Sequence, residues 1–240
     1  MFLFSSLLGT HLLCDVLRYP GNDFEAFLSK FVDYLCLLRG VRAIISDRWH
    51  ILRQTEFRPI FDAAEASIPS QIPEGNCRHK VCDTLKVLIK FLASSLDELS
   101  FDACRQAIEL LMSIFHAFRT PPKSSEGSTN AIFAWPVLVP AEYAGLLRER
   151  NPGALIILAH YAVLLHYHRD IWIFGDGGKF LIRSVTGYLG MDWKQWLAWP
   201  NHALTDVLEA LHLKHKDPGK SRDHRQELVC QLTLLIKNQE

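Results

Sequence analysis

Three histidines, His160, His166 and His168, lie in one apolar segment and are the first candidates for metal binding or proton transfer. Metal ligands on a helix need a spacing of three or four residues, because only such positions share a face. His160 and His166 are six residues apart, and His166 and His168 point to different sides of a helix. We therefore expect His160 to be buried with one hydrogen bond, and "HYHRD" to be a solvated helix end.

The charged clusters elsewhere do not supply a catalytic site either. "DRWH", from Asp47 to His50, and "RDHR", from Arg222 to Arg225, are typical of solvated charges. Nucleophilic catalysis needs a nucleophile, a base and a residue that orients the base within hydrogen-bond reach. No stretch groups those three parts, and neither His-Glu-x-x-His nor Gly-x-Ser-x-Gly occurs. The sequence therefore gives no indication of an enzyme.

Six cysteines stand at positions 14, 36, 77, 82, 104 and 230. No two are separated by two residues, so the Cys-x-x-Cys spacing of zinc sites is missing. Cys77 and Cys82 are the nearest pair, and a metal site or a disulfide there is the alternative to buried thiols. We expect buried thiols and a reducing compartment, because the other four cysteines are scattered.

The segment "IFGDGGKF" places three glycines, Gly175, Gly177 and Gly178, within four positions. Their spacing matches neither the phosphate-binding loop nor the dinucleotide-binding pattern. Two interpretations remain open. The glycines form a turn between helices that needs positive φ angles, or they form a hinge whose backbone approaches a bound molecule.

The segment "GMDWKQWLAWP", from Gly190 to Pro200, holds three of the six tryptophans. At about 100° per residue, Trp193, Trp196 and Trp199 cover roughly 120° of a helix and form one apolar face. Stacking of nucleic-acid bases on such a face needs basic neighbours, and only Lys194 is close. The face is either a plug that closes the end of a helical bundle or the wall or lid of a ligand cavity.

Helical periodicity dominates the chain, and alternation typical of strands is hard to find. The prediction is an all-α fold, a single domain over residues 1–240 built as a bundle of about ten helices. The polar stretch Arg119–Asn130 is predicted to be an exposed loop that does not separate domains. Besides a first helix near Leu3–Leu17 and a short one at Asp192–Pro200, the expected helices are Phe24–Leu38, Val41–Leu52, Phe57–Ala66, Val81–Leu96, Phe101–Phe118, Ile132–Arg148, Ala154–Leu165, Phe180–Leu189, Ala203–Leu213 and Arg225–Lys237.

The helix around Ala154–Leu165 is apolar on nearly every face. Such a helix is usually central, with neighbours all round. Asn151 is a natural cap for it, and Pro152 suits its first turn. Other expected boundaries are N-caps at Ser100 and Asn201, a start or kink at Pro136 and Pro140, a capping box at Asp192 and Gln195, and an end at Pro200.

The overall charge of the chain is balanced, with 26 basic and 26 acidic residues. Proteins that wrap nucleic acid are normally basic, so we expect no direct contact with nucleic acid. The apolar start "MFLFSSLLGTHLL" lacks a positive flank and a cleavage pattern, and therefore does not indicate a signal peptide. The longest dense apolar stretch is about half a membrane span, so no membrane span is expected.

The second half, about Phe133 to Pro200, carries an ordered run of motifs: "FAWPVLVPAEYAGLLRERNPGALIILAHYAVLLH", then "DIWIFGDGGKFLI", then "MDWKQWLAWP". In this order the motifs resemble the C-terminal regulatory domain of fungal zinc-cluster transcription factors, especially the sterol uptake control protein group. The first half resembles that domain more loosely, through "LCLLRGVRAI" at Leu35–Ile44.

The resemblance implies an all-α, effector-sensing and dimerising domain with an apolar internal cavity that binds ergosterol. It implies that bound sterol keeps the factor out of the nucleus and that sterol depletion releases it to activate transcription by RNA polymerase II. Nuclear localisation with cytoplasmic shuttling, a homodimer, and a sterol or another apolar small molecule as ligand follow from it. No cofactor is implied for this domain.

The family's six-cysteine zinc cluster and its basic linker are not found in these residues. DNA binding is therefore not carried over to this chain. Three explanations stay open: an excised domain, a truncated gene model or a free-standing relative.

A ligand pocket in this domain would be lined by large apolar residues of the matched segments and gated by the glycine turn. An interaction and dimerisation module without a small-molecule ligand is the alternative, and an unrecognised enzyme ranks last. The predicted ligand-binding residues are Trp135, Leu158, Tyr161, Ala162, Leu165, Trp172, Phe180, Leu181 and Trp196, with Gly175, Gly177 and Gly178 as the gating turn.

Overall fold

The computed structural model describes residues 9, 11–17, 23–52, 80–118 and 127–205; for 41–52, 80, 117, 127–131 and 134 it describes the backbone alone. Within these ranges every regular element is a helix and none is a strand, which confirms the predicted all-α fold class. Residues 11–17 are helical as well. The named elements are α2 (Phe24–Leu52), α4 (Lys80–Ala93), α5 (Glu98–Ala117), α6 (Gly127–Leu138), α7 (Ala141–Arg148), α8 (Pro152–Tyr167), α9 (Gly177–Leu189), the 3₁₀ turn η1 (Met191–Trp193) and α10 (Lys194–Ala203).

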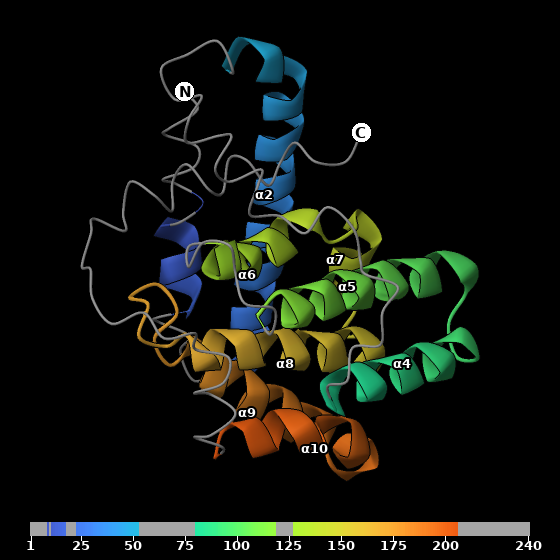
Figure 1. Ribbon diagram of the computed structural model, residues 1–240. Coiled ribbons are helices and arrows are strands. Elements are labelled where there is room, and N and C mark those ends of the chain that lie inside the picture. Colours follow the sequence, from blue (N-terminus) through green and yellow to red (C-terminus); the bar gives the residue numbers. More distant parts are fainter. Residues whose placement is uncertain (1–8, 10, 18–22, 53–79, 119–126, 206–240) are drawn as a thin grey trace.

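Helix α8 lies in the middle of the described helices (Figure 1). Its start is capped as predicted, because Asn151 Oδ1 accepts hydrogen bonds from the amides of Gly153 at 2.9 Å and Ala154 at 3.4 Å. Every residue from Gly153 to Tyr167 is buried. Helices α5, α7, α9 and α10 all contact it. The predicted central helix with neighbours all round is therefore confirmed.

The other helices form layers on either side of α8 in Figure 1. Helices α5 and α6 lie on one side of α8, and α9 and α10 lie on the other. Helix α2 runs steeply across this stack and contacts α6 and α7. Helix α4 runs beside α5 and also contacts α10, so it joins the two sides.

One predicted helix boundary is wrong, and one predicted effect of a proline is confirmed. The break expected around Gly40 is absent, and α2 continues through it, since an isolated glycine only weakens a helix by about 1 kcal/mol. The helix expected over Ile132–Arg148, with a start or kink at Pro136 and Pro140, is divided into α6 and α7 at Pro140, whereas Pro136 lies inside α6. A proline disfavours helical geometry at the preceding residue, here Val139, and Pro140 itself is extended, with ψ 158°.

Side-chain hydrogen bonds explain other differences. Asp97, and not Ser100, caps α5, because its carboxylate accepts from the Ser100 amide at 3.2 Å. The Oγ atoms of Ser94 and Ser95 donate to the carbonyl of Phe91 at 2.8 and 3.0 Å, and α4 ends before Leu96.

Helix α10 does not end at Pro200 but runs to Ala203. The predicted capping box at Asp192 is replaced by the turn η1, which follows Gly190 at φ +72°. Asn201, expected to cap the next helix, lies inside α10, and its Nδ2 donates to Thr186 Oγ1 and to the Leu197 carbonyl at 2.9 Å each.

The cysteines differ from the expectation in two respects. Cys82 is disulfide-bonded. Cys36 is exposed, whereas Cys14 and Cys104 are buried free thiols, and burial raises the pKa of Cys104 to about 12.

Several expectations fall outside the described residues: the helices Phe57–Ala66 and Arg225–Lys237, most of Ala203–Leu213, the start of the first helix, and residues 119–126 of the predicted loop. The last four residues of that loop, 127–130, belong to α6. In the part of the chain that the structure describes, no helix is both long and apolar enough to cross a membrane.

The Asn151 cap leads to a stability prediction. Asn151→Ala should lower the free energy of unfolding by about 1 kcal/mol, because two amides at the start of the buried helix lose their acceptor. Chemical denaturation followed by circular dichroism measures the change. Asn151→Ser restores a capping oxygen and should recover most of the loss; equal destabilisation by both variants would contradict a role for the cap.

Candidate functional site

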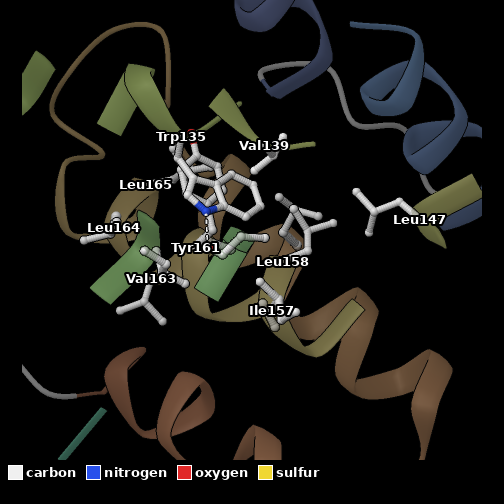
Figure 2. Packing of buried hydrophobic residues seen from close by; sticks show 14 of the residues in the cluster. Trp135, Val139, Leu147, Ile157, Leu158, Tyr161, Val163, Leu164 and Leu165 are labelled. Atoms are coloured by element: carbon white, nitrogen blue, oxygen red, sulfur yellow. Dashed lines mark hydrogen bonds between the residues drawn. The ribbon is translucent and has the colours of Figure 1, made fainter. Parts of the chain in front are cut away.

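The largest buried side chains gather around Trp135 in α6. Its ring stacks on Tyr161 of α8, with ring centroids 4.3 Å apart and planes 17° apart. Tyr143 of α7 meets the same indole edge-on at 5.5 Å. All three side chains are fully buried. Figure 2 shows the Trp135 and Tyr161 rings one over the other among leucine, isoleucine and valine side chains.

Each polar atom of this aromatic group donates a hydrogen bond to a backbone carbonyl of another helix. Trp135 Nε1 donates to Ala107 of α5 at 2.9 Å. Tyr143 donates to Ala154 of α8 at 2.9 Å, and Tyr161 donates to Ile132 of α6 at 3.1 Å. Burial raises the pKa of both tyrosines well above its usual value, so both hydroxyls remain donors. The group therefore joins α5, α6, α7 and α8.

The twelve predicted ligand-binding residues fall into separate groups. Leu158, Tyr161, Ala162 and Leu165 share a face of α8, where Tyr161 meets Trp135. Helix α6, which carries Trp135, and α10 lie on opposite sides of α8 (Figure 1).

The remaining predicted side chains lie on α9, on α10 and in the turn before α9. In α9, Leu181 is fully buried, and half-buried Phe180 meets Phe27 of α2 edge-on at 5.2 Å. In α10, Trp196 contacts Phe91 of α4 at 5.4 Å. Trp172, in the turn before α9, is 41% exposed.

The three glycines of the predicted gate have different roles in the fold. Gly175 is the one with positive φ, at +44°, so the turn interpretation fits that position. Gly177 and Gly178 are buried in the first turn of α9. A Cβ on Gly178 would lie 2.4 Å from the His166 amide nitrogen and 2.5 Å from the Ala162 carbonyl oxygen. At these two positions glycine allows close packing, with α8 at Gly178 and with Leu17 at Gly177.

His160 is fully buried on α8. Its Nδ1 is 2.9 Å from the Ile156 carbonyl oxygen, and its ring stacks on Trp199 of α10 at 5.6 Å. Burial lowers its pKa to about 4, although the bond to Ile156 opposes that shift. The prediction of a buried histidine with one hydrogen bond is confirmed.

The prediction that "HYHRD" is a solvated helix end is wrong for both of its histidines. His166 is 6% exposed and His168 is 7% exposed, whereas Arg169 and Asp170 are exposed. His168 lies against Phe118, with ring centroids 4.9 Å apart, and its Nδ1 is 2.9 Å from the Leu164 carbonyl. Burial lowers the pKa of His166, and the positive charges of Arg169 and Lys179 lower it further.

The three tryptophans around α10 hold it against its neighbours. Trp193 and Trp196 both contact Phe91 of α4, at 5.9 and 5.4 Å. Trp199 meets Phe115 of α5 edge-on at 5.5 Å and stacks on His160. The face predicted from sequence therefore packs against three helices, α4, α5 and α8.

Sequence reasoning missed the partners of these aromatic residues. Phe91 and Phe115 each belong to ordinary amphipathic helices, and neither has a neighbour in sequence that marks it. Tyr34 was also missed; its hydroxyl is buried and receives no hydrogen-bond partner from the described residues. A buried tyrosine on a helix has no sequence signal that separates it from other core positions.

The described side chains also bear on metal binding. Among the side chains that the structure describes, no group of three or more His, Cys, Asp or Glu residues could hold a metal ion.

No protein-family model, curated protein or solved structure matches the chain. The family resemblance therefore depends on the ordered motifs alone.

The glycine contacts lead to a prediction with opposite signs at two positions of α9. Gly178→Ala should destabilise the fold by about 1–3 kcal/mol, because the new methyl group meets backbone atoms of α8 that cannot move aside. Gly187→Ala has open space and should stabilise the helix by up to about 1 kcal/mol. Thermal and chemical denaturation of both variants measure this; an equal effect at both positions would refute the packing role.

His160 leads to a pH prediction. A histidine whose folded pKa is about 4, against 6.5 for an unperturbed histidine, binds a proton more readily in the unfolded chain between these values. Stability is therefore retained above pH 6.5 and is lost as the pH falls towards 4, by about 3 kcal/mol for this group. Unfolding free energies of the wild type and His160→Gln across this range should differ in slope; parallel curves would contradict the burial of a neutral imidazole.

Proposed function

We propose that this chain is the ligand-sensing and dimerising regulatory domain of a fungal transcription factor, and that its ligand is a sterol or another apolar small molecule. The observation that carries the proposal is the motif order. The matched segments are α6, α7, α8, the glycine turn with α9, and α10, which together surround the apolar centre of the described structure. The motifs therefore coincide with the core of the domain.

The composition of this core supports an apolar ligand. Ligand sites for such molecules are mostly apolar, with a few polar groups that fix orientation. Most side chains of α8 are aliphatic. Its buried side chains with a polar atom are His160, His166, Tyr161 and Tyr167. The glycine contacts place α9 directly on α8, so a ligand that separates these helices would also move α10, which contacts both. That movement is the proposed route from ligand to regulation.

Titration with dehydroergosterol, a fluorescent sterol, tests the proposal. Energy transfer from tryptophan to the sterol should be saturable and should be reversed by unlabelled ergosterol. A folded, helical sample that shows no transfer would overturn the sterol proposal.

A glycine pair tests the proposed gate in the same assay. Gly177→Asp should weaken sterol binding at least tenfold, because a side chain there meets Leu17 at 2.8 Å and displaces the start of α9. Gly187→Asp, in open space on the same helix, should bind as the wild type does. Circular dichroism confirms that both variants are folded. Unchanged affinity in Gly177→Asp would count against the gate.

A second candidate function is an interaction and dimerisation module that holds no ligand. The observation in its favour is an exposed apolar surface, here called the α4–η1 surface, made by Val87, Phe91, Met191 and Trp193. Met191 is 75% exposed and Val87 is 55% exposed, and Phe91 of α4 contacts Trp193 of η1. A second copy of the chain is the proposed occupant.

Sedimentation velocity tests this candidate. Val87→Ser with Met191→Ser should shift a dimer to a monomer, because the dimer loses buried apolar area. Tyr188→Ser provides a control: Tyr188 is also exposed but faces Phe24 of α2 at 5.4 Å. The same sedimenting species for the wild type and the double variant would dismiss this surface as a dimer contact.

A further inference from the structure

The hydrogen bond of His160 fixes which ring nitrogen carries the proton. Its Nδ1 lies 2.9 Å from the carbonyl oxygen of Ile156, and a carbonyl can only accept. The imidazole is therefore an Nδ1–H tautomer, and Nε2 carries a lone pair that can only accept a hydrogen bond.

That acceptor has no donor among the described residues. His160 is 0% exposed, and Nε2 is buried without a hydrogen-bond partner. The donors of the Trp135 group do not serve it, since Trp135, Tyr143 and Tyr161 all donate to backbone carbonyls. Buried polar atoms are normally satisfied, so an acceptor of this kind indicates a missing partner.

The imidazole that carries this acceptor lies against an aromatic ring of another helix. The imidazole stacks on Trp199 of α10, and Trp199 in turn meets Phe115 of α5 edge-on. Helix α10 is joined to α9 through Gly190, at φ +72°, and the short turn η1. A Cβ on Gly190 would have open space, because this residue is exposed.

We propose that Nε2 of His160 is the polar recognition point of a buried binding site beneath α10, where it accepts a hydrogen bond from the hydroxyl group of an otherwise apolar ligand. The inference deepens the proposed function and rests on it for the claim that the domain takes up an apolar molecule. It adds the position of the ligand, next to Trp199, and the chemical group that the domain recognises.

The chemistry of the site selects a hydroxyl group. A cationic ligand would need an anionic partner, and no aspartate or glutamate side chain is buried among the described residues. An anionic ligand would meet an acceptor lone pair. A lone water molecule usually needs two to four polar partners, whereas a hydroxyl on an apolar body needs one acceptor and places its remaining atoms against the aromatic rings.

Nitrogen NMR of the full chain with labelled histidine tests the proposal directly. The probes are dehydroergosterol and dodecanol, compared with the acetate ester of the sterol and the methyl ether of dodecanol, which cannot donate. Both alcohols should shift the His160 Nε2 resonance in the direction expected for an accepted hydrogen bond, and the blocked analogues should not. His168, which makes the same Nδ1 contact to Leu164, serves as the internal reference. His160→Gln assigns the resonance.

The outcomes separate this inference from the proposed function. Sterol binding by energy transfer without a shift at His160 would overturn the inference and leave the sensor proposal standing. A shift with dodecanol alone would support the inference and overturn the sterol as ligand. A resonance already hydrogen-bonded before any probe is added, and unchanged afterwards, would identify a bound water and overturn the inference.

Substitutions give a second readout. His160→Leu should weaken binding of the alcohols at least tenfold and leave the blocked analogues unaffected. His160→Gln places an acceptor near the position of Nε2 and should retain part of the preference for the alcohol. If His160→Leu does not fold, His160→Phe takes its place, because it keeps a ring at this position without an acceptor and should lose the preference for the alcohol. An unchanged alcohol preference in the folded variant would contradict the site.

Discussion

The fold depends on the burial of α8. A helix without a polar face is stable in water only when other helices cover every side of it, because the apolar surface it removes from water is the main favourable term in folding. From Gly153 to Tyr167 each residue is buried, and α5, α7, α9 and α10 contact this helix directly. The close approach at Gly178 and the tryptophans of α10 are consequences of that requirement.

Hydrogen bonds give this apolar core its specific arrangement. Trp135, Tyr143 and Tyr161 each donate to a carbonyl on a different helix, and a loss of any of these bonds would leave a buried polar group unsatisfied. Apolar contacts alone tolerate sliding of one helix along another, whereas three directed bonds do not. His160 departs from this pattern, since one of its nitrogens is satisfied within α8 and the other has no donor in the described core. That difference is why a ligand is inferred at His160 and not at the Trp135 group.

The candidate site could be predicted from sequence only in part. The residue types were visible: the glycine turn, the tryptophan run and the apolar helix with its histidines all lie where the motifs are. The partners of these residues on other helices could not be predicted from the sequence. Trp196 contacts Phe91, Trp199 contacts His160, and Gly178 packs against the backbone of Ala162. Each of these contacts joins two different helices. Periodicity reports which face of a helix is apolar but not which other helix covers it.

The sequence by itself determined the helical class, the central position of α8 and its start at Asn151, because periodicity, apolar content and a capping side chain act within one segment. Tertiary structure decided the rest. It let α10 run past Pro200, buried His166 and His168, and made Gly177 and Gly178 contact points between elements. Local preferences at these positions are about 1 kcal/mol for a glycine in a helix and a few for a proline, and packing against neighbouring helices outweighs them.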